Sequence, residues 1–328
     1  MSSRTLTYVK AFNEGMHQLM AEDPDIFLAG EDVAGYGGVF HMFDGLLDAY
    51  GSRRVFDTPI SEQAIIGLGT GAAARGLRPV VDLMFMDFLG VCMDQVANQA
   101  AKMKYMYGGT VSVPLTITTA GGAGLSSAAQ HSQSLEAWVA HIPGLKVVMP
   151  SSPYDAKGLI VAAVRDDNPV IVVLNKKLLG MKGEVPEELY SVPIGQASVV
   201  REGTHVSVVA IGRMVPEALK AAETLSGEGI SLEVIDPRSI SPFDTATVVE
   251  SVRKTNRALV VHEAVEFAGI GAEITAQIQY EAFDYLDAPI IRLGAPYCPV
   301  PFSPVLEAAY VPDAARIADG ARRLVARG

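Results

Sequence analysis

The sequence HIPGLKVVMPSSPYDAKGLIVAAVRDDNPVIVVL, residues 141–174, predicts a strand, a helix and a second strand in that order. Apolar runs at 145–149 and 170–174 flank a helical pattern at 152–164, which Pro153 opens near its first turn. The second run is rich in valine and isoleucine without polar alternation, which is typical of a strand covered on both faces. This stretch therefore indicates an α/β fold built on a parallel sheet.

The same alternation extends over most of the chain. Before this stretch, we expect strands at 26–29, 55–56, 79–85 and 115–119, and helices at 8–19, 61–74, 88–103 and 132–140. Beyond residue 205, we expect strands at 206–211, 231–235, 258–262 and 289–293, and helices near 216–225, 245–254, 272–283 and 314–325. The pattern weakens in between, so we predict two α/β domains, 1–185 and 204–328, joined by a linker at 186–203.

Length and composition agree with two globular domains. The chain has 328 residues, and roughly 150 residues form a typical domain. The net charge of −11 argues against nucleic acid as the main partner, because phosphate binding needs a basic surface. Two cysteines exclude a disulfide framework and a multi-cysteine metal site, and a reducing cytoplasm is the simple interpretation. The first residues lack an apolar core of signal-peptide length, and no apolar run of about 18 residues is present, so we expect neither a signal peptide nor a membrane span.

The glycines of Gly67-Leu-Gly-Thr-Gly71 raise the alternative of a nicotinamide-dependent oxidoreductase. A dinucleotide-binding loop must join a strand to a helix N-terminus, where free N–H groups point at the phosphate. These glycines instead lie inside the helix expected at 61–74. Close helix packing through small residues is the better interpretation.

The sequence Asp57-Thr-Pro-Ile-Ser-Glu62 places a carboxylate at a helix start, with Ser61 as the expected N-cap. A first-turn carboxylate that the helix dipole favours is one interpretation. The other is a carboxyl group in apolar surroundings, bordered by Ile60 and Ile65, that shares a proton with a ligand.

The cluster Ala128-Ala-Gln-His-Ser-Gln133 follows a glycine-rich turn after a buried strand. Ligands bind at such strand ends in α/β sheets. His131 is therefore either a general acid or base, since imidazole changes charge near neutral pH, or a hydrogen-bonded structural histidine.

Many ordered stretches together resemble one family. They are RVFDTPISE ending at Glu62, GLRPV at Gly76, LMFMDF ending at Phe88, DQVANQAAK at Asp94, AAQHSQS at Ala128, HIPGLKVVMPSSPYDAKGL at His141 and DPRSISPFD at Asp236. Over nearly its whole length, the chain resembles the β subunit of the thiamine-diphosphate-dependent first component of 2-oxo acid and acetoin dehydrogenase complexes.

The resemblance implies a fold of two three-layer α/β domains, the first like the pyrimidine-binding domain of transketolases and the second like their C-terminal domain. It also implies a heterotetramer of two α and two β chains with the cofactor between α and β. The chain contains no GDG motif followed by the asparagine with which related enzymes hold the magnesium diphosphate. We therefore expect the α subunit to bind magnesium and the diphosphate, and the isolated chain to be inactive.

Site residues follow from the same resemblance. Glu62 would bond the aminopyrimidine ring and promote the imino tautomer that deprotonates the thiazolium carbon. Phe88 would stack on the pyrimidine, and Met84 would line that pocket. His131 would transfer protons during attack on the substrate or lipoyl group, and Glu31 would belong to a buried proton path between active sites. A structural potassium ion of some members would be held at Leu115, Ala163, Val164, Asp166 and Asn168.

The implied reaction is oxidative: acetoin is cleaved or a 2-oxo acid is decarboxylated, and the acyl unit passes to a lipoyl group of the dihydrolipoyl acyltransferase core. The turn Thr118-Thr-Ala-Gly-Gly-Ala-Gly124 is more similar to acetoin dehydrogenases than to pyruvate-type members. Pyruvate and branched-chain 2-oxo acids remain alternative substrates. A non-catalytic assembly subunit is disfavoured, because Glu62, Phe88 and His131 are all present.

Overall fold

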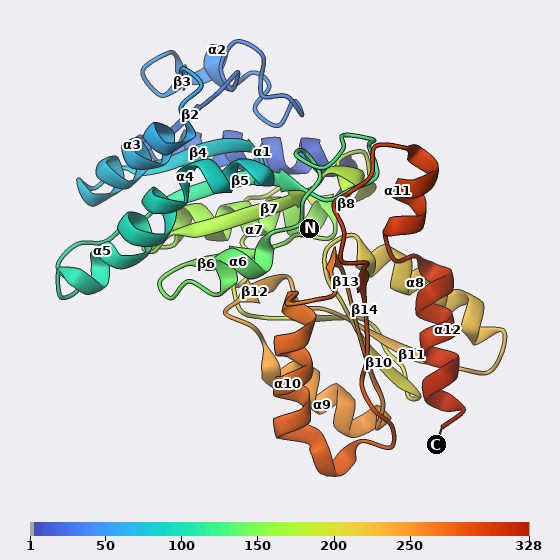
Figure 1. Cartoon of the computed structure of the whole chain (residues 1–328). Coiled ribbons are helices and arrows are strands. Elements are labelled where there is room, and N and C mark those ends of the chain that lie inside the picture. The colour runs from blue at the N-terminus through green and yellow to red at the C-terminus, as the bar shows by residue number, and fades with distance from the viewer. Residues whose placement is uncertain (1–2, 328) are drawn as a thin grey trace. The chain divides into compact units, whose positions relative to one another are not determined.

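The structure is a computed structural model that describes residues 3–327. The chain forms two compact units. The first consists of the chain up to Gly121 together with Trp138–Ile194, and the second of Gly122–Ala137 together with the chain from Gly195 onward. Both units have the α/β architecture that the sequence predicts (Figure 1).

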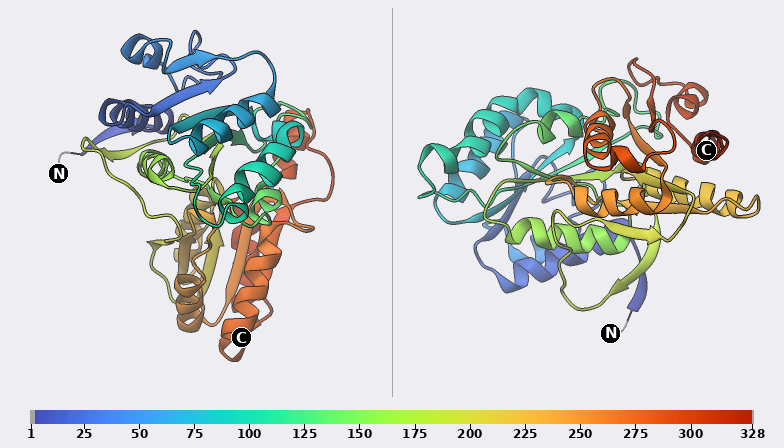
Figure 2. Two further views of the ribbon diagram at one scale, coloured as in Figure 1. Left: turned by 90° about the vertical axis from the view of Figure 1, so that its left-hand side faces the viewer. Right: turned by 90° about the horizontal axis from the view of Figure 1, so that it is seen from below.

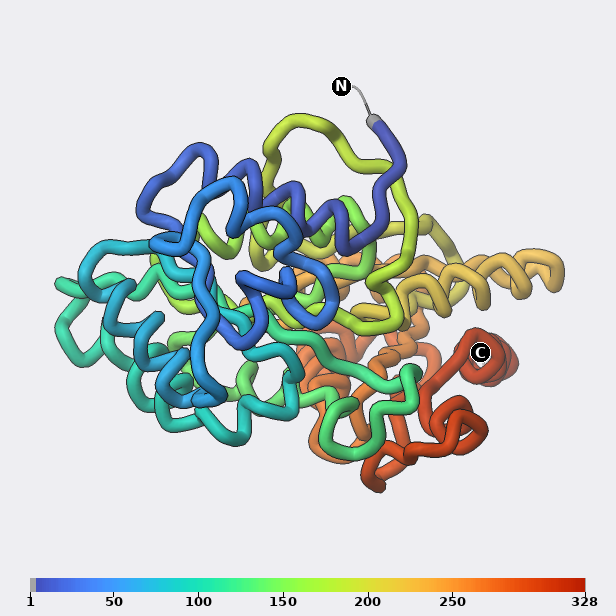
Figure 3. Tube along the Cα trace, turned by 90° about the horizontal axis from the view of Figure 1, so that it is seen from above, coloured from blue at the N-terminus to red at the C-terminus, as the bar shows by residue number. Residues whose placement is uncertain are grey.

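The first unit is built on a parallel sheet with the strand order β6-β7-β5-β4-β2-β3. Its strands are β2 (Ile26–Gly30), β3 (Val55–Asp57), β4 (Arg78–Phe85), β5 (Thr116–Gly121), β6 (Lys146–Val148) and β7 (Val170–Asn175). A separate antiparallel pair, β1 (Ser3–Thr7) and β8 (Lys182–Pro186), lies side by side in Figure 3, in blue and yellow-green. Because the central strands are parallel, their carboxyl ends share one edge, which is where such sheets bind ligands.

Helices cover both faces of this sheet. On one face, α1 (Tyr8–Glu22) packs on α7 (Pro153–Arg165), and both contact the strands. On the other face lie α3 (Glu62–Ala74) and a long, locally irregular helix. That helix consists of η1 (Met86–Phe88), α4 (Leu89–Asp94), the π-helical η2 (Gln95–Ala100) and α5 (Ala101–Met106). The short helices α2 (Leu46–Tyr50), α6 (Glu136–Ala140) and η3 (Lys176–Leu178) lie in connections.

The second unit has a five-stranded sheet of order β14-β13-β10-β11-β9, in which only β9 is antiparallel. Its strands are β9 (Ser198–Arg201), β10 (Val206–Ala210), β11 (Leu232–Asp236), β13 (Ala258–Val265) and β14 (Ile291–Ala295), with the short β12 (Ser239–Ser241) after β11. Figures 1 and 2 show helix pairs on its two faces, α8 (Met214–Ser226) with α12 (Ala314–Val325), and α9 (Thr245–Thr255) with α10 (Ile270–Ala282). The short η4 (Phe283–Tyr285) and α11 (Pro304–Tyr310) complete the unit.

Local sequence explains where the main helices begin. The side chains of Thr7, Ser152, Asp244 and Asp313 each accept a backbone N–H in the first turn of α1, α7, α9 and α12. The expected glycine packing is confirmed at Gly69 of α3, where an added Cβ would lie 2.7 Å from a Leu115 methyl group and 3.0 Å from a Val81 methyl group. No helix within residues 3–327 has the length and apolarity needed to cross a bilayer.

Several details differ from the sequence predictions. The helix expected at 132–140 covers only Glu136–Ala140. Ser61 does not cap α3 with its side chain; its hydroxyl donates instead to the Pro59 carbonyl at 3.0 Å. Within 186–203, Val192 is buried against the core of the first unit, and the second half contains β9.

Candidate functional site

The chain segment before α3 is fastened to the end of β2. The Thr58 N–H donates to the Gly30 carbonyl at 2.9 Å, and the Asp57 carboxylate accepts the N–H groups of Ala34 and Gly35 at 2.7 and 3.2 Å. These bonds place half-buried Glu62 in the first turn of α3, at the carboxyl edge of the sheet. The expected apolar border is wrong at Ile60, whose side chain is 82% exposed, because the residue lies on the outside of the turn.

Glu31, the residue after β2, is an electrostatic neighbour of Glu62. Burial raises the pKa of Glu31, the nearby Glu62 charge raises it further, and a hydrogen bond from the Ser61 N–H opposes both. Within the described part of the chain, Oε1 of Glu31 is buried without a hydrogen-bond partner. Two carboxyl groups, of which Glu31 has a raised pKa, therefore lie together at the start of α3, an arrangement suited to proton transfer.

A third carboxyl group, Asp82 on β4, lies beside them. Gly30 is its register partner, and a Cβ on Gly30 would lie 3.1 Å from the Cβ of Asp82, so only glycine leaves room there. Asp82 accepts the Thr118 hydroxyl at 2.6 Å and the Met84 N–H at 3.1 Å. Burial raises the pKa of Asp82 to about 6, and the Glu31 charge contributes to the rise.

A β-bulge after Asp82 re-aims Met84. The β4–β5 register shifts between Asp82 and Phe85, and Met84 has a φ of +58°, a left-handed conformation that is costly for a residue with a side chain. The hydrogen bond from the Met84 N–H to the Asp82 carboxyl group helps to hold that conformation. Bulges of this kind often redirect a side chain at functional sites.

Phe88 follows the bulge in η1 and is half-buried. Its ring meets that of Phe85 edge-on at 5.8 Å. The Phe88 carbonyl accepts the Cys92 thiol at 3.6 Å. Burial, with a smaller effect of the Glu62 charge, raises the pKa of that thiol to about 12, so Cys92 stays protonated and is no nucleophile. Glu31, Glu62, Met84 and Phe88 thus all lie after neighbouring strands or on the bulge of one sheet.

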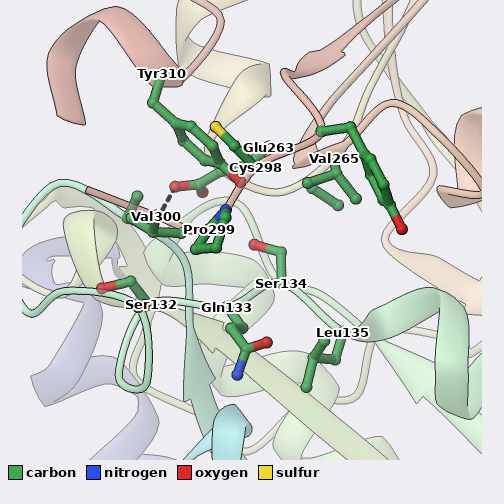
Figure 4. Close-up of a pocket in the computed structure, with 14 residues that line it drawn as sticks. Ser132, Gln133, Ser134, Leu135, Glu263, Val265, Cys298, Pro299, Val300 and Tyr310 are labelled. Carbon is green, nitrogen blue, oxygen red and sulfur yellow. Dashed lines mark hydrogen bonds between the residues drawn. The ribbon is translucent and has the colours of Figure 1, made fainter. Parts of the chain in front are cut away.

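His131 belongs to the second unit. It is half-buried in the segment Gly122–Ala137, which follows β5. This segment lines a cavity of about 410 Å³ within the second unit (Figure 4). Figure 4 shows residues of this segment on one side of the cavity, namely Ser132, Gln133, Ser134 and Leu135. The other side is formed by residues of the C-terminal part, among them Cys298, Pro299, Val300 and Tyr310.

Two buried carboxyl groups accompany this segment. Glu263 accepts the Ala123 N–H at 2.6 Å, the bond drawn in Figure 4. Burial raises the pKa of Glu136 to about 7, and the Glu263 charge adds to the effect. Asp82, Glu263 and Glu136 were not predicted as site residues; the pairing of Gly30 with Asp82 is a signal that only the strand register reveals.

The five residues expected at a potassium ion lie near one another in the first unit. The Leu115 carbonyl accepts the Val170 N–H at 2.9 Å, and the Ala163 carbonyl accepts the Asp166 N–H at 3.2 Å. The Arg78 guanidinium donates to the carbonyls of Val164 and Asp166 at 3.0 and 3.2 Å. Each carbonyl oxygen has a second lone pair, so these bonds leave acceptor capacity for a cation.

The side chains at this place are already bonded to one another. Lys146 pairs with the Asp166 carboxylate, which also accepts the Asn168 side-chain amide at 2.8 Å. Burial alone would raise the pKa of Asp166, but these bonds hold it below its ordinary value. Lys104 donates to Oδ1 of Asn168 at 3.0 Å. Backbone carbonyls, rather than these side chains, are the groups that fit a monovalent ion.

Comparison with known proteins agrees with this architecture. The family model described as transketolase, pyrimidine binding domain, matches residues 4–182, and that described as transketolase, C-terminal domain, matches residues 195–317. A solved structure titled split gene transketolase, inactive beta4 tetramer, superposes with a TM-score of 0.80 over 98% of this chain and 99% of that chain. At 22% sequence identity, this likeness concerns the fold.

Curated relatives are much closer in sequence. The chain is 48% identical to beta subunits of acetoin:2,6-dichlorophenolindophenol oxidoreductase from Cupriavidus necator, with 99% of each chain covered, and from Bacillus subtilis, with 96% covered. It is 44% identical to a pyruvate dehydrogenase beta subunit of Oryza sativa over 98% of this chain and 87% of that one. The fold and these matches define a protein of two transketolase-type domains. Within that class, the chain belongs to the family of β subunits of thiamine-diphosphate-dependent acetoin and 2-oxo acid dehydrogenases.

Proposed function

We propose that this chain supplies the pyrimidine-binding half of a thiamine diphosphate site and that Glu62 is its acid–base residue. The adjacency of Glu31 and Glu62 at the start of α3 carries this proposal. A carboxyl group that faces a ring nitrogen must both donate and accept a proton during a catalytic cycle. A neighbouring carboxyl group with a raised pKa, which Glu31 provides, is a suitable source and store for that proton.

When bound, thiamine diphosphate would supply a carbon nucleophile toward the substrate carbonyl and, in its cationic ring, an acceptor for the negative charge of the reaction. The residues of this chain bind and orient it. Glu62 hydrogen-bonds the aminopyrimidine, while Met84 and Phe88 form apolar walls for that ring. Their positions on and after the bulge of β4 support this assignment. His131 transfers protons to and from the substrate or lipoyl group, and Glu31 belongs to a proton path from Glu62.

The α subunit is the proposed holder of magnesium and the diphosphate, in a heterotetramer of two α and two β chains. Acetoin is the favoured substrate, because the relatives named for acetoin are 48% identical and the rice pyruvate relative is 44% identical. The acyl unit then passes to a lipoyl group of the acyltransferase core. A cytoplasmic location is supported by the free thiols of Cys92 and Cys298.

A potassium ion held at Leu115, Ala163, Val164, Asp166 and Asn168, several of them through backbone carbonyls, is also part of the proposal. The proximity of these groups supports it. The test is thermal unfolding of the chain in potassium chloride and in choline chloride at equal ionic strength. A specific site predicts a higher midpoint in potassium, and equal midpoints would contradict it.

The activity is tested by co-expressing the chain with an α subunit of the same family. Oxidation of acetoin, pyruvate and branched 2-oxo acids is then compared with 2,6-dichlorophenolindophenol as electron acceptor. We expect thiamine-dependent turnover that is fastest with acetoin, and none from the isolated chain. Faster turnover of pyruvate would reassign the substrate, whereas tight nicotinamide binding by the chain alone would revive the oxidoreductase alternative.

A further inference from the structure

The backbone that leads to His131 is held by two buried carboxylates from distant parts of the sequence. Glu307, on α11, accepts the N–H groups of Gly124 and Ser126 at 2.6 and 2.9 Å, and the Ser126 hydroxyl lies 3.5 Å from the same carboxylate. Glu307 is 3% exposed and makes no ion pair within residues 3–327. These donors therefore satisfy the oxygen atoms of its buried carboxyl group.

Glu263 and Arg213 bind the two backbone polar groups of Ala123, the residue before Gly124. The Glu263 carboxylate accepts the Ala123 N–H at 2.6 Å, and the Arg213 guanidinium donates to the Ala123 carbonyl at 2.9 Å. Arg213 also pairs with Glu263 at 3.2 Å. The Gly122 N–H donates to the Gln133 carbonyl at 3.3 Å. This bond connects the start of the segment to the part of the same segment that contains His131.

The segment needs such bonds, because its own conformation and packing would not hold it. Ser126 and Ala128 have φ values of +53° and +58°, which side chains rarely adopt, and such strain persists only where the surroundings enforce it. One side of the segment faces the cavity of about 410 Å³ shown in Figure 4, so close packing is missing there. Polar contacts from the C-terminal part must supply the rigidity.

We propose that Glu307, together with the Glu263–Arg213 pair, positions His131 for proton transfer by fixing the backbone of Gly122–Ser126. This inference rests on the proposed function of His131. It gives the C-terminal part of the chain an indirect role in catalysis: its carboxylates set the conformation of the acid–base segment. A displacement of about 1 Å at a reacting group can lower the rate by about a hundredfold, so the loss of these bonds has a measurable consequence.

The test compares Glu307→Gln and Glu307→Ala with wild type in the complex with the α subunit. The glutamine variant keeps the volume and one acceptor oxygen but places an amide NH₂ where the second oxygen was. Glu217→Ala is the matched control, since Glu217 accepts the Ala314 N–H at 3.2 Å in the same unit and does not touch the segment. Measured are hydrogen exchange of the amides at 122–133, kcat, the pH profile of kcat and the Kd of thiamine diphosphate.

For Glu307→Ala, we expect amide exchange at 124 and 126 to accelerate at least about tenfold and kcat to fall about 10- to 100-fold, with the cofactor Kd within about twofold. For Glu307→Gln, amide exchange and kcat should lie between those of wild type and of the alanine variant. In both variants, the part of the pH dependence of kcat that is due to His131 should become smaller. Glu217→Ala should leave the exchange at 122–133 and kcat unchanged.

Wild-type exchange at 124 and 126 in both variants, or faster exchange with an undiminished kcat, would overturn the inference. His131→Ala in the same assay separates it from the function proposed above. If His131→Ala is inactive and the Glu307 variants are normal, only the positioning role fails. Full activity of His131→Ala would overturn the positioning role and the catalytic role of His131 together.

Discussion

The region around Glu62 and the region around His131 are held in place by different means. Glu62 starts a regular helix; of its neighbours, Glu31 directly follows β2, and Asp82 lies within the adjacent strand β4 of the same sheet. His131 lies in irregular chain whose backbone is bonded to Glu263 and Glu307. The first arrangement is a product of sheet register, whereas the second depends on side chains that are about 140 and 180 residues away in the sequence.

The two regions also use carboxyl groups in different ways. Near Glu62, burial raises the pKa of Glu31 and Asp82, so these groups hold their protons to higher pH. At the His131 segment, burial likewise raises the pKa of Glu136, but Glu263 and Glu307 accept backbone N–H groups of the segment. Fixation of the backbone by carboxyl groups is therefore the feature that sets the His131 region apart.

The largest effect is expected from removing the Glu62 carboxyl group. Glu62→Ala should lower turnover of the assembled complex by about 10³-fold or more, within the range of general acid–base catalysis. Assembly with the α subunit should be unchanged in size-exclusion chromatography. Gln63→Ala, which changes the exposed neighbour on α3, is the control and should retain normal turnover. Normal turnover by Glu62→Ala would remove Glu62 from the mechanism.

A smaller loss is expected at His131. His131→Ala should lower turnover about 100-fold, because water can replace part of the proton transfer of an imidazole. The cofactor Kd should change little, since the residues proposed to bind the pyrimidine belong to the other region. His141→Ala, an exposed histidine ten positions away, should be neutral. Equal turnover of the two variants would make His131 a structural histidine.

Glu136 should make the stability of the chain depend on pH. Its pKa is raised from 4.5 to about 7 in the folded chain, first by burial and then by Glu263. The unfolded chain releases this proton near pH 4.5, so the stabilisation is complete below that pH and is lost as the pH rises through about 7. Each pKa unit corresponds to about 1.4 kcal/mol, which gives a loss of up to about 3 kcal/mol.

Urea unfolding at pH 4 and pH 8 measures this effect. Glu136→Gln stays neutral, so its unfolding free energy should exceed that of wild type at pH 8 and match it at pH 4. Glu250→Gln, an exposed glutamate on α9, should show no such difference. A wild-type pH dependence in Glu136→Gln would contradict the assignment.

Asp82 should give a somewhat smaller effect in the first unit. Its pKa is raised from 3.8 to about 6 by burial, so its stabilisation is present below pH 3.8 and is lost as the pH rises through about 6. Asp82→Asn should flatten that dependence and keep the cofactor affinity, because an amide can still bond the Thr118 hydroxyl and the Met84 N–H. Asp82→Ala loses both bonds and should weaken cofactor binding. Equal cofactor affinity in both variants would show that the bonds of Asp82 do not determine the position of Met84.

The regular parts of the fold follow from sequence patterns because their causes are local. The apolar stripe of α1, the proline at the start of α7 and the uninterrupted apolar strand β7 each depend on neighbouring residues. The exposed side chain of Ile60 and the hydroxyl bond of Ser61 depend on the path of the turn before α3. Residue type does not determine that path.

The parts that could not be predicted depend on contacts between distant residues. The grouping of Gly122–Ala137 with the second unit follows from bonds to Arg213, Glu263 and Glu307. The roles of Gly30 and Asp82 follow from a strand register. Local motifs single out Glu62 and His131 but leave a structural alternative open for each. Their roles, and the choice of Glu31, Met84 and Phe88, were predicted from the resemblance to a family.

The central claim is that the carboxyl group of Glu62 takes part in proton transfer at the aminopyrimidine of the cofactor. Solvent hydrogen exchange at the reactive carbon of thiamine diphosphate, measured by NMR after rapid quenching of the substrate-free complex, tests it most directly. We predict that exchange in the Glu62→Ala complex is slower than in wild type by about 10²-fold or more while the cofactor remains bound. Exchange at the wild-type rate with bound cofactor would contradict the claim.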